Sequence, residues 1–238
     1  MAASAKPSES LNMPSAPASF AGFFDDTRTP CLATKRLIIR PARNDDFHGW
    51  SQLRQTSRAF LTQWEGAWND DIYKRASFRD KLRHERLAIN RGEGFPFLLV
   101  RREDRQILGG VILSHIRRGE EMACTAGAWM GQPYAQKGYM AEAMRAILPF
   151  AFQKLGLTRM EACCLPHNVP SIRILEGVGF RQEGLARRYR HINGAWRDHL
   201  LLAAISDERE SDAGTASGLP IGEVSRQKAA GKNQTERP

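Results

Sequence analysis

The sequence predicts a mixed α/β fold, an α+β arrangement in which helices cover one mixed sheet in a single domain. Three apolar segments, at residues 96–102, 107–116 and 122–131, are separated by short polar turns, which is typical of an antiparallel β-meander. The third segment leads through a glycine-containing turn into residues 138–152, where apolar side chains recur at helical spacing. A second strand and helix follow at residues 158–180. This order predicts a sheet that begins antiparallel and then gains a helix crossover.

A strand and a helix precede the meander. Residues 36–41, RLIIRP, form a β-branched run that ends at a proline. Residues 44–46, NDD, are favourable N-cap residues for a helix that carries Phe47, Trp50 and Leu53 on one face. We expect this helix to pack on the sheet through that face.

An aromatic segment and a second helix come next. Residues 57–70 have the composition of a loop but contain Phe60, Trp64 and Trp68. Aromatic residues in a loop either seal the core or line a pocket, and the core is the favoured interpretation. Residues 73–90 form a strongly charged helix with a thin apolar stripe.

The last third of the domain continues the alternation of strand and helix. A strand at residues 158–165 is followed by a helix at 166–180, which Asn168 can cap. A short strand-like segment, a hairpin turn at Asn193-Gly194 and a final strand at 197–205 complete the domain. The predicted order is β-α-α-β-β-β-α-β-α-β-β.

Composition indicates a cytoplasmic protein with a basic domain and two tails. Residues 1–33 are rich in Ala, Ser and Pro, and residues 207–238 have no hydrophobic pattern, so both are expected to be disordered around a domain at 34–206. No apolar run approaches the ~20 residues of a membrane helix. The net charge is +9; residues 1–35 sum to zero and residues 206–238 to −1, which leaves +10 for the middle. A basic domain favours an anionic ligand or partner, such as a nucleotide cofactor, RNA or a ribonucleoprotein.

The cysteines do not predict a metal site. Cys31, Cys124, Cys163 and Cys164 form no C-x-x-C pair and have no histidines at zinc spacing. We expect buried free thiols and no metal.

The stretch from residue 128 to 152 is the best candidate for a ligand site. Gly138 has no Cβ, so the backbone of the turn can approach a ligand closely. Free N–H groups and the helix dipole at the start of the following helix favour an anion, most plausibly a phosphate. The alternative is an ordinary strand-to-helix connection.

These features together resemble the GNAT superfamily of acetyl-CoA-dependent N-acetyltransferases. The resemblance rests on the Gly138 turn between strand and helix, then a strand, Asn168, and a helix that ends in Gly179-Phe180. The segments TKRLIIRP, EGVGF and GAWRDHLLLAAI are similar to the RimJ/RimL branch, which acetylates the N-terminal alanine of ribosomal proteins. RAFLTQWE and LPHN, with Tyr189 and WRDH downstream, are similar to its RimJ side. The resemblance spans residues 34–206 and implies acetyl-CoA as acetyl donor, a protein N-terminus as acceptor and possible association with the ribosome.

The resemblance also implies which residues hold the cofactor. The family's pyrophosphate loop is written Q/R-x-x-G-x-G/A; with its fixed glycine at Gly138, the first and last positions are Ala135 and Met140, which depart from the pattern. That loop binds mainly through backbone N–H groups, so the departures do not exclude binding. The implied pyrophosphate contacts are Gln136, Lys137, Gly138, Tyr139 and Met140. Trp129 and Met130 would bind the pantetheine arm through their backbone, Asn168 would reach the pantetheine region, and Ser171 would lie near the thiol. The alternatives are a helix cap for Asn168 and a first-turn helix residue for Ser171.

The reaction implied by the resemblance does not demand a strong base. A protein α-amino group has a pKa of about 7.7–8.0, against about 10.4 for lysine, so it is partly neutral near pH 7. The backbone N–H around Met130 is the expected oxyanion donor. Residues that commonly serve this family as proton donor and base are replaced by Leu175 and Cys163.

The remaining candidates for catalysis and acceptor binding are therefore less usual ones. Ser171 could protonate the leaving thiolate, and Tyr189 or His191 could lie near the amine. Glu161 shares a strand face with Cys163 and could be a base, the alternative being a strand-end salt bridge. Trp64 and Glu65 are expected to bind the incoming ammonium group. Two other functions stay open: acetylation of a small amine such as a polyamine or aminoglycoside, and a non-catalytic acetyl-CoA-binding or RNA-binding module.

Overall fold

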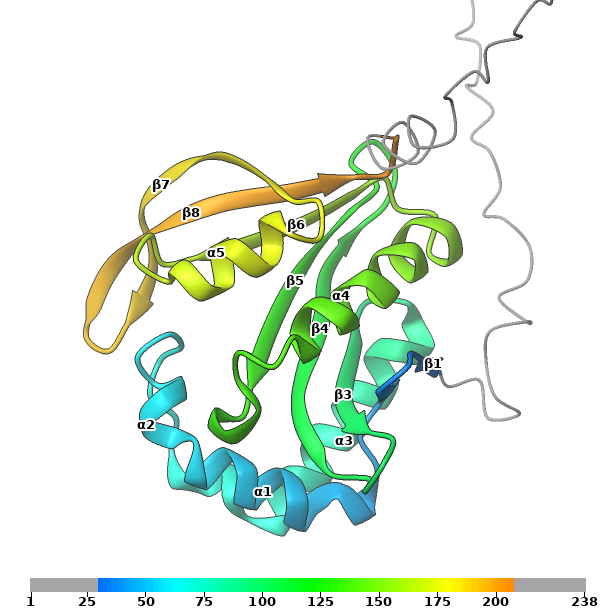
Figure 1. The fold of residues 1–238 in the computed structure, drawn as a ribbon, viewed down its shortest axis with the longest axis vertical. Helices are drawn as coiled ribbons and strands as arrows, with labels where there is room; N and C mark the ends of the chain where they lie inside the picture. Colours follow the sequence, from blue (N-terminus) through cyan, green and yellow to red (C-terminus); the bar gives the residue numbers. More distant parts are fainter. Residues whose placement is uncertain (1–29, 208–238) are drawn as a thin grey trace, which may run out of the picture.

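The computed structural model describes residues 30–207, in which eight strands form one sheet with helices on both faces (Figure 1). The strands are β1 (Leu32–Ala33), β2 (Leu37–Arg40), β3 (Phe95–Arg101), β4 (Ile107–Arg117), β5 (Ala123–Met130), β6 (Arg159–Cys164), β7 (Arg181–Ile192) and β8 (Ala195–Ile205). The α-helices are α1 (Phe47–Thr56), α2 (Arg58–Leu61), α3 (Arg75–Arg91), α4 (Tyr139–Pro149) and α5 (Val169–Glu176). Shorter helical turns are η1 (Asn44–Asp46), η2 (Asp70–Tyr73), η3 (Gln132–Tyr134) and η4 (Phe150–Lys154).

The sheet confirms the predicted fold class. Its order is β1-β2-β3-β4-β5-β6-β8-β7. Neighbouring strands are antiparallel except β5 and β6, which are parallel because α4 carries the chain back between them. The predicted meander is β3, β4 and β5, joined by short turns.

Two apolar clusters hold the helices on the sheet. The larger lies between the sheet and α4, whose buried residues recur at the predicted spacing of three and four. These residues are Tyr139, Met140, Ala143, Met144, Ile147 and Leu148. The second cluster joins the opposite face of the sheet to α1 and α3 through Trp50, Leu53, Phe78 and Leu82. Each face of the sheet therefore has its own core.

The structure departs from the sequence prediction at several element boundaries. Residues 57–70 are not entirely a loop, since α2 forms within them. β1 lies inside the segment that was predicted to be disordered, because it pairs with β2. α5 ends at Glu176 rather than near Phe180. The remainder of both predicted tails lies outside the described residues.

Three further expectations can be compared with the described residues. All four cysteines are free, but Cys31 is exposed rather than buried, and Cys163 is only partly buried. Within residues 30–207, no group of three or more His, Cys, Asp or Glu side chains is placed to hold a metal ion. In the same range, no helix has the length and apolar character needed to cross a membrane.

Candidate active site

Strands β5 and β6 diverge in the middle of the sheet. They pair only from Ala123 to Thr125 on β5, opposite residues 159–161 on β6. Beyond this point β5 continues to Met130 against β4, while β6 continues against β8. The edge of β5 from Ala126 to Met130 therefore has no strand beside it.

The backbone of Met130, unlike that of Trp129, is oriented toward that open edge. A Cβ added to Gly109 of β4 would lie 2.4 Å from the carbonyl oxygen of Trp129, so this carbonyl points at β4. In a planar trans peptide the carbonyl and the following N–H point in opposite directions. The N–H of Met130 therefore points away from β4, into the opening. Gly109 is needed here because any side chain would displace β5.

The turn after β5 presents unpaired N–H groups. Gln136 and Gly138 both adopt left-handed backbone conformations, with φ of 60° and 77°. No acceptor among residues 30–207 bonds the backbone N–H of Gln136, Lys137 or Gly138. Gly138 is the N-cap of α4, so its neighbours add the positive end of the helix dipole. This arrangement fits a phosphate or pyrophosphate group.

Tyr139 and Met140 can contribute only their backbone to this turn. Both side chains are buried in the core beneath α4. The departure of Met140 from the family's written pattern is thus explained by packing, since its side chain faces the core rather than the turn.

Arg36, which directly precedes β2, stabilises the turn. Its Nη1 donates to the carbonyl oxygen of Lys137 at 3.0 Å, and its guanidinium carbon lies 4.3 Å from the centre of the Tyr139 ring. Its Nε donates to Glu142 of α4 at 2.5 Å. Glu142 also accepts from the backbone N–H of Arg36 at 2.9 Å and from Thr34 Oγ1 at 2.6 Å. Burial alone would raise the pKa of Glu142, but these hydrogen bonds outweigh it and lower the pKa.

Asn168 and Ser171 lie where β6 ends and α5 begins. Asn168 is the N-cap of α5: its Oδ1 accepts from the N–H of Ser171 at 3.3 Å. The cap role is thus confirmed. The residue is 8% exposed, and its Nδ2 has no acceptor among the described residues, so it remains able to donate to a ligand. Ser171 is partly buried in the first turn of α5.

A charged pair lies on the other face of the sheet, beside Trp129. Arg54 of α1 is held between two indole rings, with its guanidinium carbon 4.0 Å from the ring centre of Trp68 and 4.8 Å from that of Trp129. Its Nη1 lies 3.0 Å from Oε1 of Glu65. The Arg54 side chain is only 12% exposed. Stacking and charge together fix the position of Glu65 relative to β5.

The Glu65 carboxylate is held by Arg54 in an ion pair that lacks good hydrogen-bond geometry. Its Oε1 is buried and, within residues 30–207, has no hydrogen-bond partner of good geometry, although the side chain as a whole is 40% exposed. Burial raises the pKa of Glu65 more than the charge of Arg54 lowers it. The exposed part of the side chain is where a donor from another molecule can reach the carboxylate.

The segment containing Glu65 spans the β6 and β7–β8 ends of the sheet. The ring of Trp64 lies 5.7 Å from that of His167, which directly precedes Asn168. Asn193, in the β7–β8 turn, accepts from the N–H of Ala67 at 2.9 Å and donates to the carbonyl oxygen of Thr62 at 2.7 Å. Neither Trp64 nor Trp68 is a core residue, so the favoured sequence interpretation of this aromatic segment is wrong. The rings instead surround the Arg54–Glu65 pair and the end of β6.

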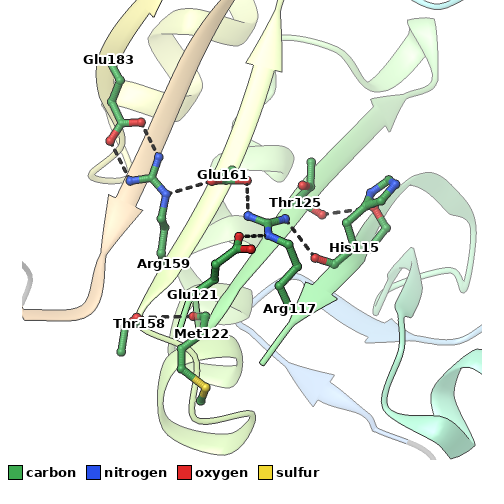
Figure 2. Close-up of polar contacts among 10 residues, drawn as sticks. His115, Arg117, Glu121, Met122, Thr125, Thr158, Arg159, Glu161 and Glu183 are labelled. Atoms are coloured by element: carbon green, nitrogen blue, oxygen red, sulfur yellow. Dashed lines mark hydrogen bonds and ion pairs between the residues drawn. The ribbon is translucent and has the colours of Figure 1, made fainter. Parts of the chain in front are cut away.

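Glu161 lies at the closed end of the divergence, within an ion-pair network (Figure 2). Arg117 Nη2 donates to its Oε2 at 2.7 Å, and Arg159 Nε donates to its Oε1 at 2.9 Å. Arg159 also binds Glu183, and Arg117 binds Glu121 (Figure 2). Burial would raise the pKa of Glu161, but the two arginines outweigh it and lower the pKa. A carboxylate so stabilised is a weak base, and the placement favours the salt-bridge interpretation.

Tyr189 and His191 both lie on β7 but point to different surroundings. The Tyr189 ring is 5.7 Å from that of the buried His199, and Tyr189 is 46% exposed. His191 is exposed and packs edge-on against Trp196 at 5.6 Å. Among residues 30–207, no hydrogen bond, ion pair or ring contact joins Glu161 or His191 to Glu65.

Sequence reasoning missed four residues that shape the site. Arg36, Arg54 and Glu142 act through contacts with distant segments, and no local pattern marks them. Ser57 is fully buried, and its Oγ accepts from the backbone N–H of Gln132 at 2.9 Å, which joins the α1–α2 junction to the turn after β5. A serine at the end of an apolar helix face gave no signal of this role.

Comparison with known proteins agrees with this geometry. Residues 36–181 match the family described as acetyltransferase (GNAT) domain. The chain is 32% identical over 179 residues to the probable N-acetyltransferase YjcK of Bacillus subtilis (strain 168). The aligned region covers 75% of this chain and 99% of that relative. It is 31% identical over 172 residues to the ribosomal protein uS5-alanine N-acetyltransferase of Escherichia coli (strain K12), covering 72% and 89%. Mycobacterium smegmatis RimJ, solved in complex with CoA-disulfide, superposes with a TM-score of 0.70 at 28% identity, covering 78% of this chain and 94% of that one.

Proposed function

The chain belongs to the acetyltransferase (GNAT) family, and from this we propose that it acetylates the N-terminal amine of a protein, with the N-terminal alanine of a ribosomal protein as the expected acceptor. It is an acetyl-CoA-dependent N-acetyltransferase of the ribosomal-protein-acetyltransferase type. The finer assignment of the acceptor draws on the relative from Escherichia coli, whose name specifies ribosomal protein uS5 and alanine. It also draws on the +10 charge of the middle of the chain, which suits a partner in a ribonucleoprotein.

The residues that would hold acetyl-CoA lie on both sides of the divergence between β5 and β6. The turn at residues 136–140 would bind the pyrophosphate through N–H groups, with Lys137 adding charge. The β5 edge would bind the pantetheine arm through the backbone of Met130 and not through that of Trp129, whose carbonyl faces β4, and Asn168 would face the arm from β6's side. When bound, acetyl-CoA supplies an acetyl group activated as a thioester. The N–H of Met130 points into the opening and would stabilise negative charge on the acetyl oxygen.

The observation that carries the acceptor assignment is the Glu65 carboxylate, whose side chain is 40% exposed and whose pKa is raised by burial. An α-ammonium group has three donors and a positive charge, so it can bind at the exposed side of this carboxylate. Glu65 would then accept a proton from the amine before attack. An N-terminal amine needs this help only weakly, because its pKa of about 7.7–8.0 is close to the working pH.

The same pair argues against a polycationic acceptor. Arg54 already compensates the charge of Glu65 at 3.0 Å, so little negative charge remains for a second or third ammonium group. Polyamines and aminoglycosides favour acidic sites, whereas this domain is basic. Of the other candidates, Ser171 would protonate the leaving thiolate from the first turn of α5. Tyr189 would lie near the peptide from β7.

The test is a thiol-release assay with acetyl-CoA and a panel of acceptors. The panel contains short peptides with free or acetylated N-terminal alanine, together with spermidine and an aminoglycoside. We expect turnover with the free peptides only. Turnover with the small amines alone, or acetyl-CoA binding without turnover of any acceptor, would overturn the proposal.

The role of Glu65 is tested by Glu65→Gln against Glu120→Gln, a glutamate in an exposed turn between β4 and β5. We expect Glu65→Gln to lower kcat/KM for the free peptide by about 10-fold, less than the roughly 100-fold typical of a general base, because the amine is already partly neutral. The Kd for acetyl-CoA should stay unchanged, and Glu120→Gln should behave as wild type. Wild-type kcat/KM in Glu65→Gln would refute the assignment of Glu65.

A further inference from the structure

The β7–β8 hairpin carries a concentration of arginine that the site does not use. Between residues 181 and 199 there are five arginines and two acids, a net charge of +3. Four of the arginines have exposed side chains with no ion-pair partner among residues 30–207: Arg187, Arg188, Arg190 and Arg197. The two acids are engaged elsewhere, since Glu183 binds Arg159 and Asp198 accepts from the backbone N–H of Arg188.

Two of these arginines face each other across the hairpin. Arg190 of β7 is paired in register with Arg197 of β8, so their side chains leave the same face of the ribbon. Like charges directly opposite each other destabilise a pair of strands. If these two residues served only solubility, opposite charges at the two positions would do so without the repulsion. An anion bound between the two guanidinium groups would remove the repulsion.

The same hairpin exposes aromatic surface. Trp196 is 54% exposed and Tyr189 is 46% exposed. β7 is the edge strand of the sheet, and charges on an edge strand commonly serve to prevent aggregation. Exposed aromatic rings work against that purpose, so edge protection explains the arginines but not the rings. Arginine and aromatic side chains together are the combination that contacts RNA phosphates and stacks on unpaired bases.

We propose that the β7–β8 hairpin binds RNA, with Arg190 and Arg197 contacting phosphates and Trp196 stacking on a base. The ribbon has both faces exposed here, because Arg190 and Arg197 lie on one face and the His191–Trp196 pair on the other. It can therefore enter a groove or loop of a folded RNA. An acidic protein segment would satisfy the arginines but would leave the rings without a role.

The hairpin is also connected to the acceptor segment. Its turn residue Asn193 binds Thr62 and Ala67, on either side of Glu65. Figure 1 shows the β7–β8 turn close to the α2 region at the border of the domain. An RNA held by the hairpin would therefore bring the N-terminus of an associated protein to the side of the sheet where Glu65 lies. Only this link to the acceptor rests on the proposed function.

The experiment measures binding of the full chain to a labelled 25-nucleotide RNA stem-loop by fluorescence anisotropy, between 50 and 200 mM salt and without acetyl-CoA or peptide. The double variant Arg190→Gln/Arg197→Gln is compared with Arg79→Gln/Arg86→Gln, which removes the same charge from exposed positions on α3. We expect the hairpin variant to bind about 10-fold more weakly at low salt. We expect the slope of log K against log salt to fall in magnitude by about 1.5 to 2, with little change in the α3 variant.

A second variant and two competitors test the base contact and the class of partner. Trp196→Ala should weaken RNA binding about 10-fold without changing the salt slope, because stacking releases no counterions. The same sequence as duplex DNA, and an acidic peptide, should compete poorly. Equal loss of binding in the hairpin and α3 variants, or competition by the acidic peptide at RNA-like concentrations, would overturn the proposal.

The peptide assay separates this proposal from the proposed function. Arg197→Gln alone should bind RNA more weakly but acetylate a short free peptide at the wild-type rate, because, among the described residues, Arg197 contacts none that is assigned to the site. Arg190 is left out of this control because its guanidinium carbon lies 5.8 Å from the ring centre of Tyr189. Loss of RNA binding with full peptide turnover supports the hairpin surface. RNA binding with no peptide turnover in the wild-type protein would contradict the acceptor assignment and leave the hairpin surface intact.

Discussion

Placing a negative charge at Gly138 tests whether the turn before α4 binds the pyrophosphate of acetyl-CoA. Gly138 has a φ of 77°, and a Cβ there would meet Arg36 Nη2 at 3.5 Å, an ordinary contact. Gly138→Asp should therefore fold at the cost of the left-handed conformation alone, about 1 kcal/mol. For a domain of this size that corresponds to a fall in Tm of roughly 2–4 °C.

Gly156 offers a matched control. It also has a left-handed backbone, with φ of 68°, and a Cβ there would meet nothing within 4 Å. It lies between η4 and β6, away from the turn. Gly156→Asp should lower the stability by the same amount as Gly138→Asp and change the net charge equally. The two variants therefore differ only in their distance from the proposed phosphate site.

The expected difference is in acetyl-CoA affinity. A unit charge about 5 Å from a phosphate charge costs roughly 1–3 kcal/mol for effective dielectric constants of about 80 to 20. This corresponds to a Kd about 5- to 150-fold higher for Gly138→Asp, measured by calorimetry, with wild-type affinity in Gly156→Asp. Equal affinities in the two folded variants would refute the placement of the pyrophosphate on this turn.

Two other predictions concern acid stability and thiol reactivity. The pKa of Glu161 is lower in the folded protein than in the unfolded chain, where it is about 4.3. Its ion pairs therefore stabilise the fold at pH values above the unfolded pKa, and this stabilisation is lost as the pH falls through the folded pKa. Glu161→Gln should thus lower Tm by roughly 2–4 °C at pH 7 and by much less at pH 3. If scanning calorimetry finds the same fall in Tm at both pH values, the assigned direction of the Glu161 pKa is wrong. With a disulfide reagent at pH 8, the exposed Cys31 should react first, whereas Cys124, whose pKa is raised to about 12 by burial, should react only on unfolding. One rapidly reacting thiol fewer in folded Cys124→Ser than in wild type would contradict the burial of Cys124.

Local patterns were sufficient for the elements nearest the cofactor. The meander is visible because each strand is apolar and each turn is short and polar. The turn at Gly138 is visible because a strand, a glycine and a helical repeat follow one another directly. These signals depend only on neighbours in the chain, so the β5–turn–α4 unit could be predicted before its packing was known.

The acceptor side was predicted less well because its contacts join distant segments. Trp64 and Trp68 were expected in the core, yet the structure places them around Arg54 and the end of β6. Spacing correctly put Glu161 on the same strand face as Cys163, but the cation that determines its pKa comes partly from Arg117, on another strand. Pairing between charges is a property of the assembled sheet.

The sequence by itself determined the fold class, the Gly138 turn and the family resemblance, because periodicity, turn residues and motif order are carried by consecutive residues. Tertiary structure alone decided that the Met130 N–H faces the open edge of β5, that Arg54 lies between two indole rings and pairs with Glu65, and that Arg190 faces Arg197. Each of these depends on strand register or on packing between segments far apart in the chain, where burial and nearby charge set the chemistry of a side chain.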